Sequence, residues 1–250
     1  FLHEPVSVQC LNHGVHVLCE KPMALNAAEC DRMLAAAESA GKQLLIGQCL
    51  RFWPAYVYLK EKVEDGSFGQ VTGGYFFRGG ATPTWGPWLL DGERSGGALM
   101  DMHVHDADMV HWLFGKPQAV SSIARKVVTS GYDVVSTNYA YPDGKVVNAQ
   151  CDWTLQGDFG FDMQYRVNFE KGNIIFRDGK VKVSPNEGAG FEPELSEDLG
   201  YYFELKYFVE SILADRPIVT ASGSSVKGTI EIVEAEKSSA DQGGAWVKLV

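Results

Sequence analysis

The sequence predicts a parallel α/β unit followed by an α+β unit with a large, open and mostly antiparallel sheet. Two observations predict this fold class. Helical and short apolar stretches alternate, with short connections, in residues 4–47, as they do in parallel βα units. After Pro117, strand-like stretches follow one another and are separated by turn signals such as Pro142-Asp143-Gly144. Such a meander leaves one sheet face for helices and one face free.

Start and stop signals give the expected bounds of each element. In the first part, helices and strands are expected at 4–12, 15–19, 27–41, 43–47, 53–64 and 71–78. A Gly-, Pro- and Trp-rich loop then leads into a helix that runs from Gly97 to Gly115. The later elements are expected at 119–128, 136–141, 146–155, 161–170, 172–176, 180–183, 201–213, 222–240 and 245–250. We expect the aromatic residues of the 201–213 helix to lie in the core.

The helix before Gly115 carries polar residues on one narrow stripe of an otherwise apolar surface. Asp101, His105 and Asp108 follow one another at spacings of four and three, which places them on one helical face. Burying carboxylates and an imidazole costs several kcal/mol unless they are paired or needed. The stripe therefore favours either a chemical site or a hydrogen-bond network that holds two layers together.

A metal site is the first rival interpretation of this helix. His103 and His105 form an HxH pair with acidic residues nearby. A helix points these two imidazoles about 160° apart, so they cannot share one ion, and we expect no metal. We instead expect His103 to be a core or interface residue, and Asp106 and His111 to be ordinary polar residues at the helix margin.

Composition excludes several function classes. The net charge of −10 is evenly spread and forms no basic stripe, so we expect no nucleic-acid partner. No apolar run approaches the length of a membrane span, and the first residues do not form a signal peptide. The five cysteines form no CxxC pair, which indicates reduced packing residues in a cytoplasmic protein.

Several motifs together resemble the Gfo/Idh/MocA family of NAD(P)-dependent oxidoreductases. They are VHVLCEKPM at 15–23, QCLRF at 48–52, the pattern W-x-x-D with GG-x-x-x-D-x-x-x-H-x-x-D in 88–108, and a SSA-x-x-x-GG-x-x-V tail at 238–247. The resemblance implies a Rossmann domain, here residues 1–50, and a substrate-binding and oligomerisation domain, residues 51–250. It also implies a homodimer or homotetramer formed through the free sheet face.

One departure from the family concerns the nucleotide. No GxGxxG phosphate loop occurs in the 250 residues, so we expect the sequence to begin inside the Rossmann domain. The preference between NAD and NADP depends on residues that the sequence lacks. The alternative to an oxidoreductase is a cofactor-less sugar-binding or dimeric scaffold remnant of the same family.

The resemblance and the chemistry of hydride transfer together name candidate site residues. His105 is the candidate base because an imidazole titrates near neutrality, and Asp101 could orient it or bind a substrate hydroxyl. By similarity, Lys21 would reach both the reacting hydroxyl and the nicotinamide, and its bond to Pro22 can be cis. The expected cofactor-binding residues are His3, Glu20, Lys21 and Pro22. Arg51, Trp85 and Asp108 are expected to bind the substrate, a sugar, cyclitol or related polyhydroxylated compound.

Overall fold

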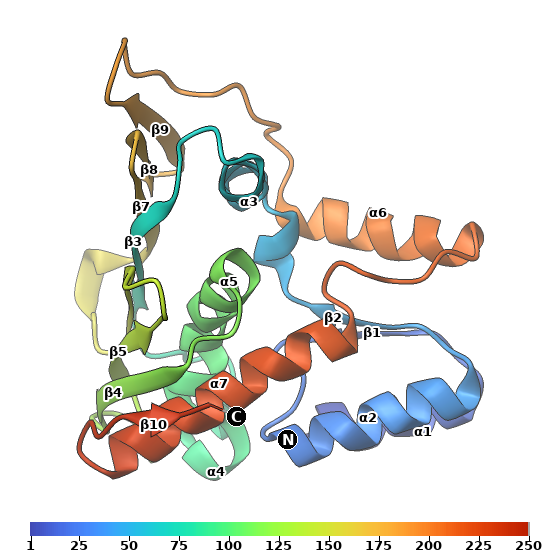
Figure 1. Cartoon of the computed structure of the whole chain (residues 1–250). Coiled ribbons are helices and arrows are strands. Elements are labelled where there is room, and N and C mark those ends of the chain that lie inside the picture. Colours follow the sequence, from blue (N-terminus) through green and yellow to red (C-terminus); the bar gives the residue numbers. More distant parts are fainter. Residues whose placement is uncertain (250) are drawn as a thin grey trace.

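The computed structural model describes residues 1–249, which begin with a parallel α/β unit. Strands β1 (Val17–Glu20) and β2 (Leu44–Gly47) pair in parallel. Helices α1 (His3–Asn12) and α2 (Ala27–Ala40) lie on the same face of this pair (Figure 1). Asn26 caps α2 by accepting a hydrogen bond from the Glu29 backbone N–H. The predicted elements are confirmed, with ends shifted by one or two residues.

The second part of the chain is built on an eight-stranded sheet. Its strands are β3 (Val71–Gly80), β4 (Ala119–Arg125), β5 (Val134–Ala140), β6 (Val146–Asp152), β7 (Phe161–Phe169), β8 (Gly172–Arg177), β9 (Lys180–Pro185) and β10 (Val247–Lys248). Their order is β10-β4-β5-β6-β3-β7-β8-β9. All neighbours are antiparallel except β3 and β6, which pair in parallel. Strand β3 therefore lies in the middle of the sheet, between two strands that come later in the chain.

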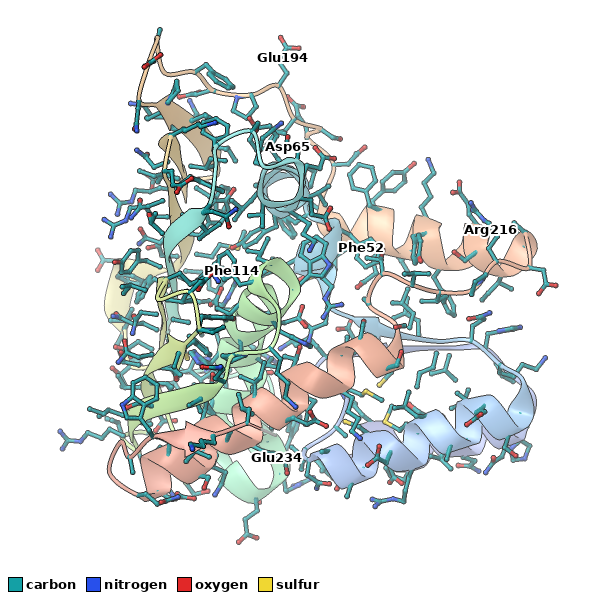
Figure 2. The ribbon with its side chains drawn as sticks, viewed as in Figure 1. Phe52, Asp65, Phe114, Glu194, Arg216 and Glu234 are labelled. Atoms are coloured by element: carbon teal, nitrogen blue, oxygen red, sulfur yellow. The ribbon has the colours of Figure 1, made fainter. Side chains whose placement is uncertain are left out.

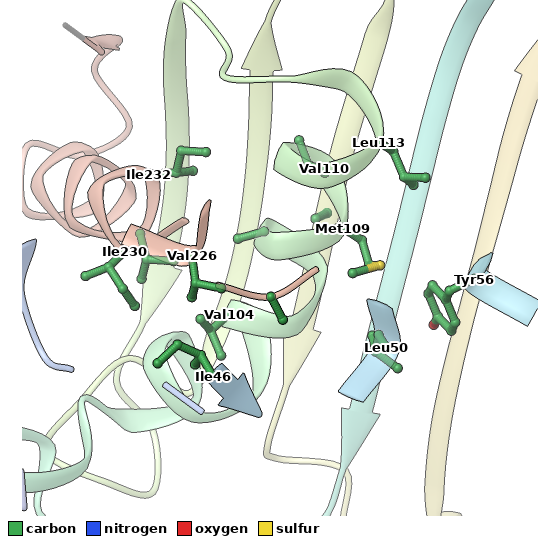
Figure 3. Packing of buried hydrophobic residues seen from close by; sticks show 14 of the residues in the cluster. Ile46, Leu50, Tyr56, Val104, Met109, Val110, Leu113, Val226, Ile230 and Ile232 are labelled. Atoms are coloured by element: carbon green, nitrogen blue, oxygen red, sulfur yellow. The ribbon is translucent and has the colours of Figure 1, made fainter. Parts of the chain in front are cut away.

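Helices cover one face of this sheet, as the sequence predicts. Helices α3 (Pro54–Asp65), α5 (Val104–Phe114) and α7 (Gly223–Asp241) lie on that side (Figure 1). Side chains from these helices fill the layer between them and the strands, and Phe114 is one of them (Figure 2). Met109 and Val226 belong to the same buried cluster (Figure 3). The other face of the sheet bears no helix of residues 1–249.

Helix α6 (Gly200–Leu213) packs on the face of the β1–β2 pair opposite to α1 and α2 (Figure 1). It contacts the 3-10 turn η1 (Cys49–Phe52) that follows β2. A Cβ atom at Gly200 would lie 2.5 Å from the backbone oxygen of Cys49, so this close approach requires glycine. The aromatic residues of α6 are not all in the core, because Tyr201 and Tyr202 are half exposed.

The helix predicted after Gly97 is present, but it does not begin as an α-helix. The short helix α4 (Gly92–Ser95) ends at a glycine pair, and a π-helical turn, η3 (Leu99–His103), leads into α5. Gly97 has φ +69°, and a Cβ atom there would lie 2.8 Å from the Tyr132 backbone nitrogen. This turn changes the direction in which the residues before α5 point, since π-helical residues are wound less tightly than α-helical ones.

The cysteines are reduced in the structure, as the sequence indicates. All five cysteines are free thiols, and Cys10 is the one that is not buried. No helix within residues 1–249 combines the length and the apolarity that crossing a bilayer requires.

Candidate active site

A pocket of about 560 Å³ opens where the end of β1 meets η3, the start of α6 and the sheet. The residues that line it include Lys21, Cys49, Arg78, Trp85, Asp101, His105, Trp153, Phe161 and Tyr201. A wider hollow of about 820 Å³ lies between α4 and α7. Its Lys237 and Asp241 already pair with each other, so the smaller pocket holds the better candidate for chemistry.

Lys21 is fixed at the pocket by its backbone and by Asp101. The Lys21–Pro22 peptide bond is cis, and the His3 Nδ1 atom lies 2.6 Å from the Pro22 carbonyl oxygen. The Lys21 ammonium donates to Asp101 Oδ1 at 3.0 Å and to the Asp101 carbonyl oxygen at 2.5 Å. Both side chains keep partial exposure, so the ion pair faces the pocket. Two of the three predicted catalytic residues, Lys21 and Asp101, are thus brought together.

His105, the predicted base, stands beside this pair and is half buried. Its Nδ1 atom is buried without a hydrogen-bond partner, so Nε2 is the nitrogen that can face the pocket. Burial, followed by the positive charges of Lys21 and Arg78, holds the pKa of His105 well below its usual range. The imidazole is therefore neutral near pH 7 and able to accept a proton.

Asp101 does not contact His105, which is one of the two roles that the sequence suggested for it. Its carboxylate binds Lys21, and no hydrogen bond joins it to His105 in the described part of the chain. The π-helical turn accounts for this difference, because an α-helical spacing of four no longer applies between the two residues. Asp101 orients the ammonium of Lys21 rather than the imidazole.

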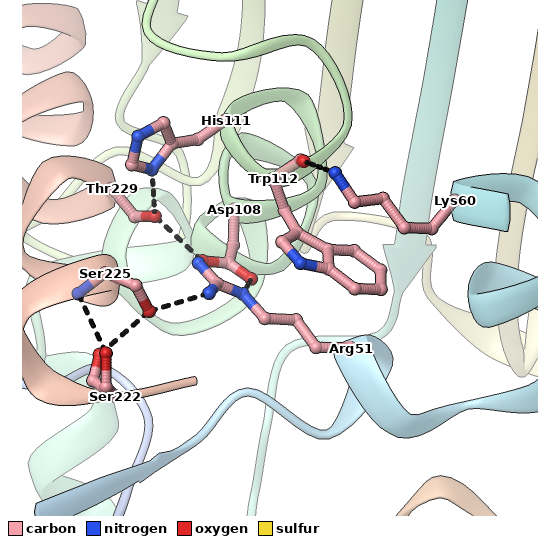
Figure 4. A network of polar contacts seen from close by, with 8 residues as sticks. All are labelled: Arg51, Lys60, Asp108, His111, Trp112, Ser222, Ser225 and Thr229. Carbon is pink, nitrogen blue, oxygen red and sulfur yellow. Dashed lines mark hydrogen bonds and ion pairs between the residues drawn. The ribbon is translucent and has the colours of Figure 1, made fainter. Parts of the chain in front are cut away.

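Arg51 and Asp108, predicted to bind substrate, bind each other instead (Figure 4). Arg51 Nε donates to Asp108 Oδ2 at 2.8 Å, and Arg51 Nη2 donates to Asp108 Oδ1 at 2.7 Å. Ser225 and Thr229 of α7 complete the network. Both charged groups are buried, and neither lines the pocket. The polar stripe of the helix therefore divides: Asp108 ties α7 to α5, while His105 serves the pocket.

Two further buried pairs occupy the same helix. Asp106, predicted at the helix margin, is wholly buried and accepts two hydrogen bonds from Arg78 at 3.2 Å, so that prediction is wrong. His103 is a core residue, as predicted, and its Nε2 lies 3.2 Å from Glu236 Oε2. Burial lowers the pKa of His103, but the Glu236 carboxylate outweighs it and the pKa is raised. His103 thus pairs with Glu236 whereas His105 lines the pocket, and no group of three or more metal-binding side chains occurs in residues 1–249.

Trp85 lines the pocket with 80% of its surface exposed, as its predicted contact with substrate requires. Trp88 of the same loop does not line this pocket and contacts the Phe1 ring edge-on. Sequence reasoning missed Arg78, Trp153 and Tyr201 as lining residues. For Arg78 a signal existed, since it is the one charged residue within a glycine- and aromatic-rich strand.

The predicted cofactor residues His3, Glu20 and Pro22 lie at the carboxyl end of β1, where open α/β sheets bind their ligands. Gln48, directly after β2, is buried, and neither its Oε1 nor its Nε2 has a partner. Glu204 of α6 is also buried and has an unpartnered Oε1. Unsatisfied buried polar atoms are costly, so this edge fits a polar ligand such as the nicotinamide end of a dinucleotide.

Two parts of the chain match family models of known proteins. Residues 1–48 match a family model described as "Oxidoreductase family, NAD-binding Rossmann fold". Residues 56–175 match a model described as "GFO/IDH/MocA C-terminal domain". The chain belongs to the GFO/IDH/MocA family of oxidoreductases. The resemblance predicted from its motifs is therefore confirmed.

Individual proteins of the family are also similar to this chain, in sequence or in structure. Trans-1,2-dihydrobenzene-1,2-diol dehydrogenase of Mus musculus is 36% identical over 146 residues, which are 57% of this chain and 43% of that protein. The alignment thus spans less than half the length of this relative. Among solved structures, aldose-aldose oxidoreductase from Caulobacter crescentus, complexed with glycerol, has a TM-score of 0.89 at 25% identity and covers 99% of this chain. GenD2 from gentamicin A biosynthesis, in complex with NAD, has a TM-score of 0.85 at 25% identity. This chain covers 76% of each of these two structures, and all of its length aligns with GenD2.

Proposed function

We propose that this protein is an NAD(P)-dependent oxidoreductase that transfers a hydride between a nicotinamide cofactor and a hydroxyl or keto carbon of a sugar, cyclitol or related polyol. The observation that carries the proposal is the convergence of Lys21, Asp101 and a neutral His105 on one pocket at the carboxyl end of β1. The family, and the similarity to a structure solved in complex with NAD, support the cofactor.

The residues divide the chemistry between them. A bound nicotinamide cofactor would supply the acceptor for the hydride of the carbinol carbon. His105 takes the hydroxyl proton at Nε2, since its Nδ1 is buried. The Lys21 ammonium, held by Asp101, stabilises the developing alkoxide and lowers the pKa of the hydroxyl. His3 holds the Pro22 carbonyl directly after Lys21, and Glu20 would contact the cofactor.

The pocket wall suits a polyhydroxylated ring. Trp85, Trp153 and Phe161 provide aromatic surface on which the apolar face of a sugar can stack. Lys21 and His105 lie among them and meet the hydroxyl groups. The uncovered face of the eight-stranded sheet is the proposed interface of a homodimer or homotetramer, because the described chain places no helix on it.

Titration of the protein with NADH and NADPH tests the proposal. Energy transfer from the tryptophans to the reduced cofactor reports binding, and a panel of sugars and cyclitols is then assayed for reduction of NAD⁺ and NADP⁺. We expect micromolar binding of one cofactor and turnover of a polyol, both weakened in Lys21→Met but not in Lys62→Met, a control lysine of α3 that pairs with Asp65 and does not line the pocket. Sugar binding without cofactor binding would instead favour the cofactor-less scaffold.

A further inference from the structure

Glu204 is a buried carboxyl group that the proposed mechanism does not use. It lies in the second turn of α6 and is 2% exposed. Its Oε1 is buried without a donor, and no described residue forms an ion pair with the carboxylate. A buried carboxylate without a partner is strongly disfavoured in its charged form. The ionised form of Glu204 is therefore stabilised only when a positive charge comes close to it.

The groups around Glu204 do not supply that charge. Glu20 of β1 faces it, and burial, followed by the charge of Glu20, raises the pKa of Glu204 to about 8. Cys49 of η1 is also close, and burial, followed by the charge of Glu204, raises the pKa of its thiol to about 11. On α6 itself, the neighbouring Cys49, followed by burial, raises the pKa of Tyr201 to about 12. Among the described residues the charge that acts on Glu204 is the acidic one of Glu20, and Arg78, a cation that acts on Cys49, is already paired with Asp106.

This cluster adjoins the proposed site of hydride transfer. Cys49 and Tyr201 line the pocket that contains Lys21 and His105. Glu20 directly precedes Lys21, and its Oε2 lies 3.0 Å from the position of a Cβ atom at Gly47, so its carboxylate reaches across to the end of β2. The acidic cluster thus sits at the strand edge where a nicotinamide ring is expected.

We propose that Glu204 is a proton-linked positioning residue that distinguishes the oxidised from the reduced nicotinamide: it is ionised beside the cationic ring and protonated beside the neutral ring. This inference rests on the proposed function. A cationic ring next to Glu20 and Glu204 stabilises both carboxylates, whereas loss of that charge returns Glu204 to the acid form. In one turnover the hydride carries its electron pair to the ring, His105 takes the hydroxyl proton, and Glu204 takes one proton from water.

Glu204 is the member of this neighbourhood that titrates near neutrality. Cys49 and Tyr201 lose their protons only well above neutral pH, and His105 gains a proton only well below neutral pH. The sign follows from linkage: ionisation of Glu204 favours the oxidised form, so the ratio Kd(NAD⁺)/Kd(NADH) falls as pH rises. The slope reaches at most about tenfold per pH unit between the pKa values of the two complexes.

The test measures both dissociation constants by tryptophan fluorescence from about pH 6 to about pH 9. In the unaltered protein the ratio falls with pH, and in Glu204→Gln it becomes independent of pH. The matched control is Glu210→Gln, an exposed carboxylate of the same helix, which keeps the wild-type slope. A flat ratio in the unaltered protein, or an unchanged slope in Glu204→Gln, overturns the inference while leaving the proposed function intact.

A second measurement needs no variant and so does not depend on Glu204→Gln folding. Calorimetric titrations in two buffers of different ionisation enthalpy count the protons exchanged on binding. We expect NAD⁺ binding to release protons near pH 8 and NADH binding not to release them. Equal proton release by both forms contradicts the inference. Absence of binding by either form overturns the proposed function, and this inference with it.

Discussion

Polar residues with and without a charged partner lie side by side in the same helical segment, η3 and α5. His103, Asp106 and Asp108 are buried, and each has a partner of opposite charge from another element. His105 has none, and two cations stand near it. A buried polar group that has a partner can be explained by stability alone, whereas one without a partner lowers stability and so points to a function. The difference separates residues that hold layers together from the one that can do chemistry.

The largest expected effect comes from removing the unsatisfied group. His105→Asn should lower turnover by about 10² to 10⁴ if His105 is the base. The free energy of unfolding should change by less than about 1 kcal/mol, because Nδ1 has no partner to lose. Steady-state rates and urea unfolding measure the two quantities. His111→Asn is the matched control: His111 lies on the same helix as His105, and its replacement removes a bond to Thr229 of α7 and should leave turnover unchanged. Equal turnover in both variants would reject the role of His105.

Removing a satisfied group should do the reverse. Asp108→Ala leaves the Arg51 guanidinium buried without its counterion and should destabilise the fold by about 3–5 kcal/mol. Urea unfolding of the variant measures this loss. The double replacement Arg51→Met with Asp108→Leu should be markedly more stable than Asp108→Ala, since it removes both charges. A loss below about 1 kcal/mol for Asp108→Ala would mean that the pair is not structural.

The third expectation concerns pH and is the smallest. The pKa of His103 is raised in the folded state by Glu236, so its ion pair stabilises the fold fully below the unfolded pKa of about 6.5. That stabilisation is lost as the pH rises through the folded-state pKa, at no more than about 1.4 kcal/mol per pH unit. The difference in unfolding free energy between the unaltered protein and His103→Gln should therefore shrink above neutrality. A difference that stays constant with pH would show that His103 is uncharged in the fold.

Local patterns sufficed for most of the elements and for the site at its centre. The cap at Asn26, the turn at Asp178-Gly179 and the apolar strand before Lys21 are each set by nearby residues, so their elements were predictable. The family motifs then placed Lys21 and His105 together, although the two are far apart in the chain. These predictions depend on sequence neighbours or on the resemblance.

The partners of charged residues could not be predicted in the same way. Asp106 pairs with Arg78, and His103 with Glu236, across long stretches of chain, and nothing local to Asp106 indicates burial. The π-helical turn also left no sequence signal. Its residues, 99–103, pack against β5 and β6, which lie far along the chain. Helical spacing assumes a regular α-helix, and it allows Asp101 either to orient His105 or to bind a substrate hydroxyl. In the structure Asp101 pairs with Lys21 instead of His105.

The position of β3 has a consequence for how the chain is made. This strand is synthesised before its neighbours β6 and β7, and it pairs with both. Until β6 has been synthesised both hydrogen-bonding edges of β3 lack their final partners, and the edge that pairs with β7 lacks its partner until residue 169 has left the ribosome. An exposed, glycine- and aromatic-rich strand of this kind can associate with other nascent chains. The centre of the sheet therefore closes only after β6 and β7 have been made, and the nascent chain is vulnerable to aggregation until it does.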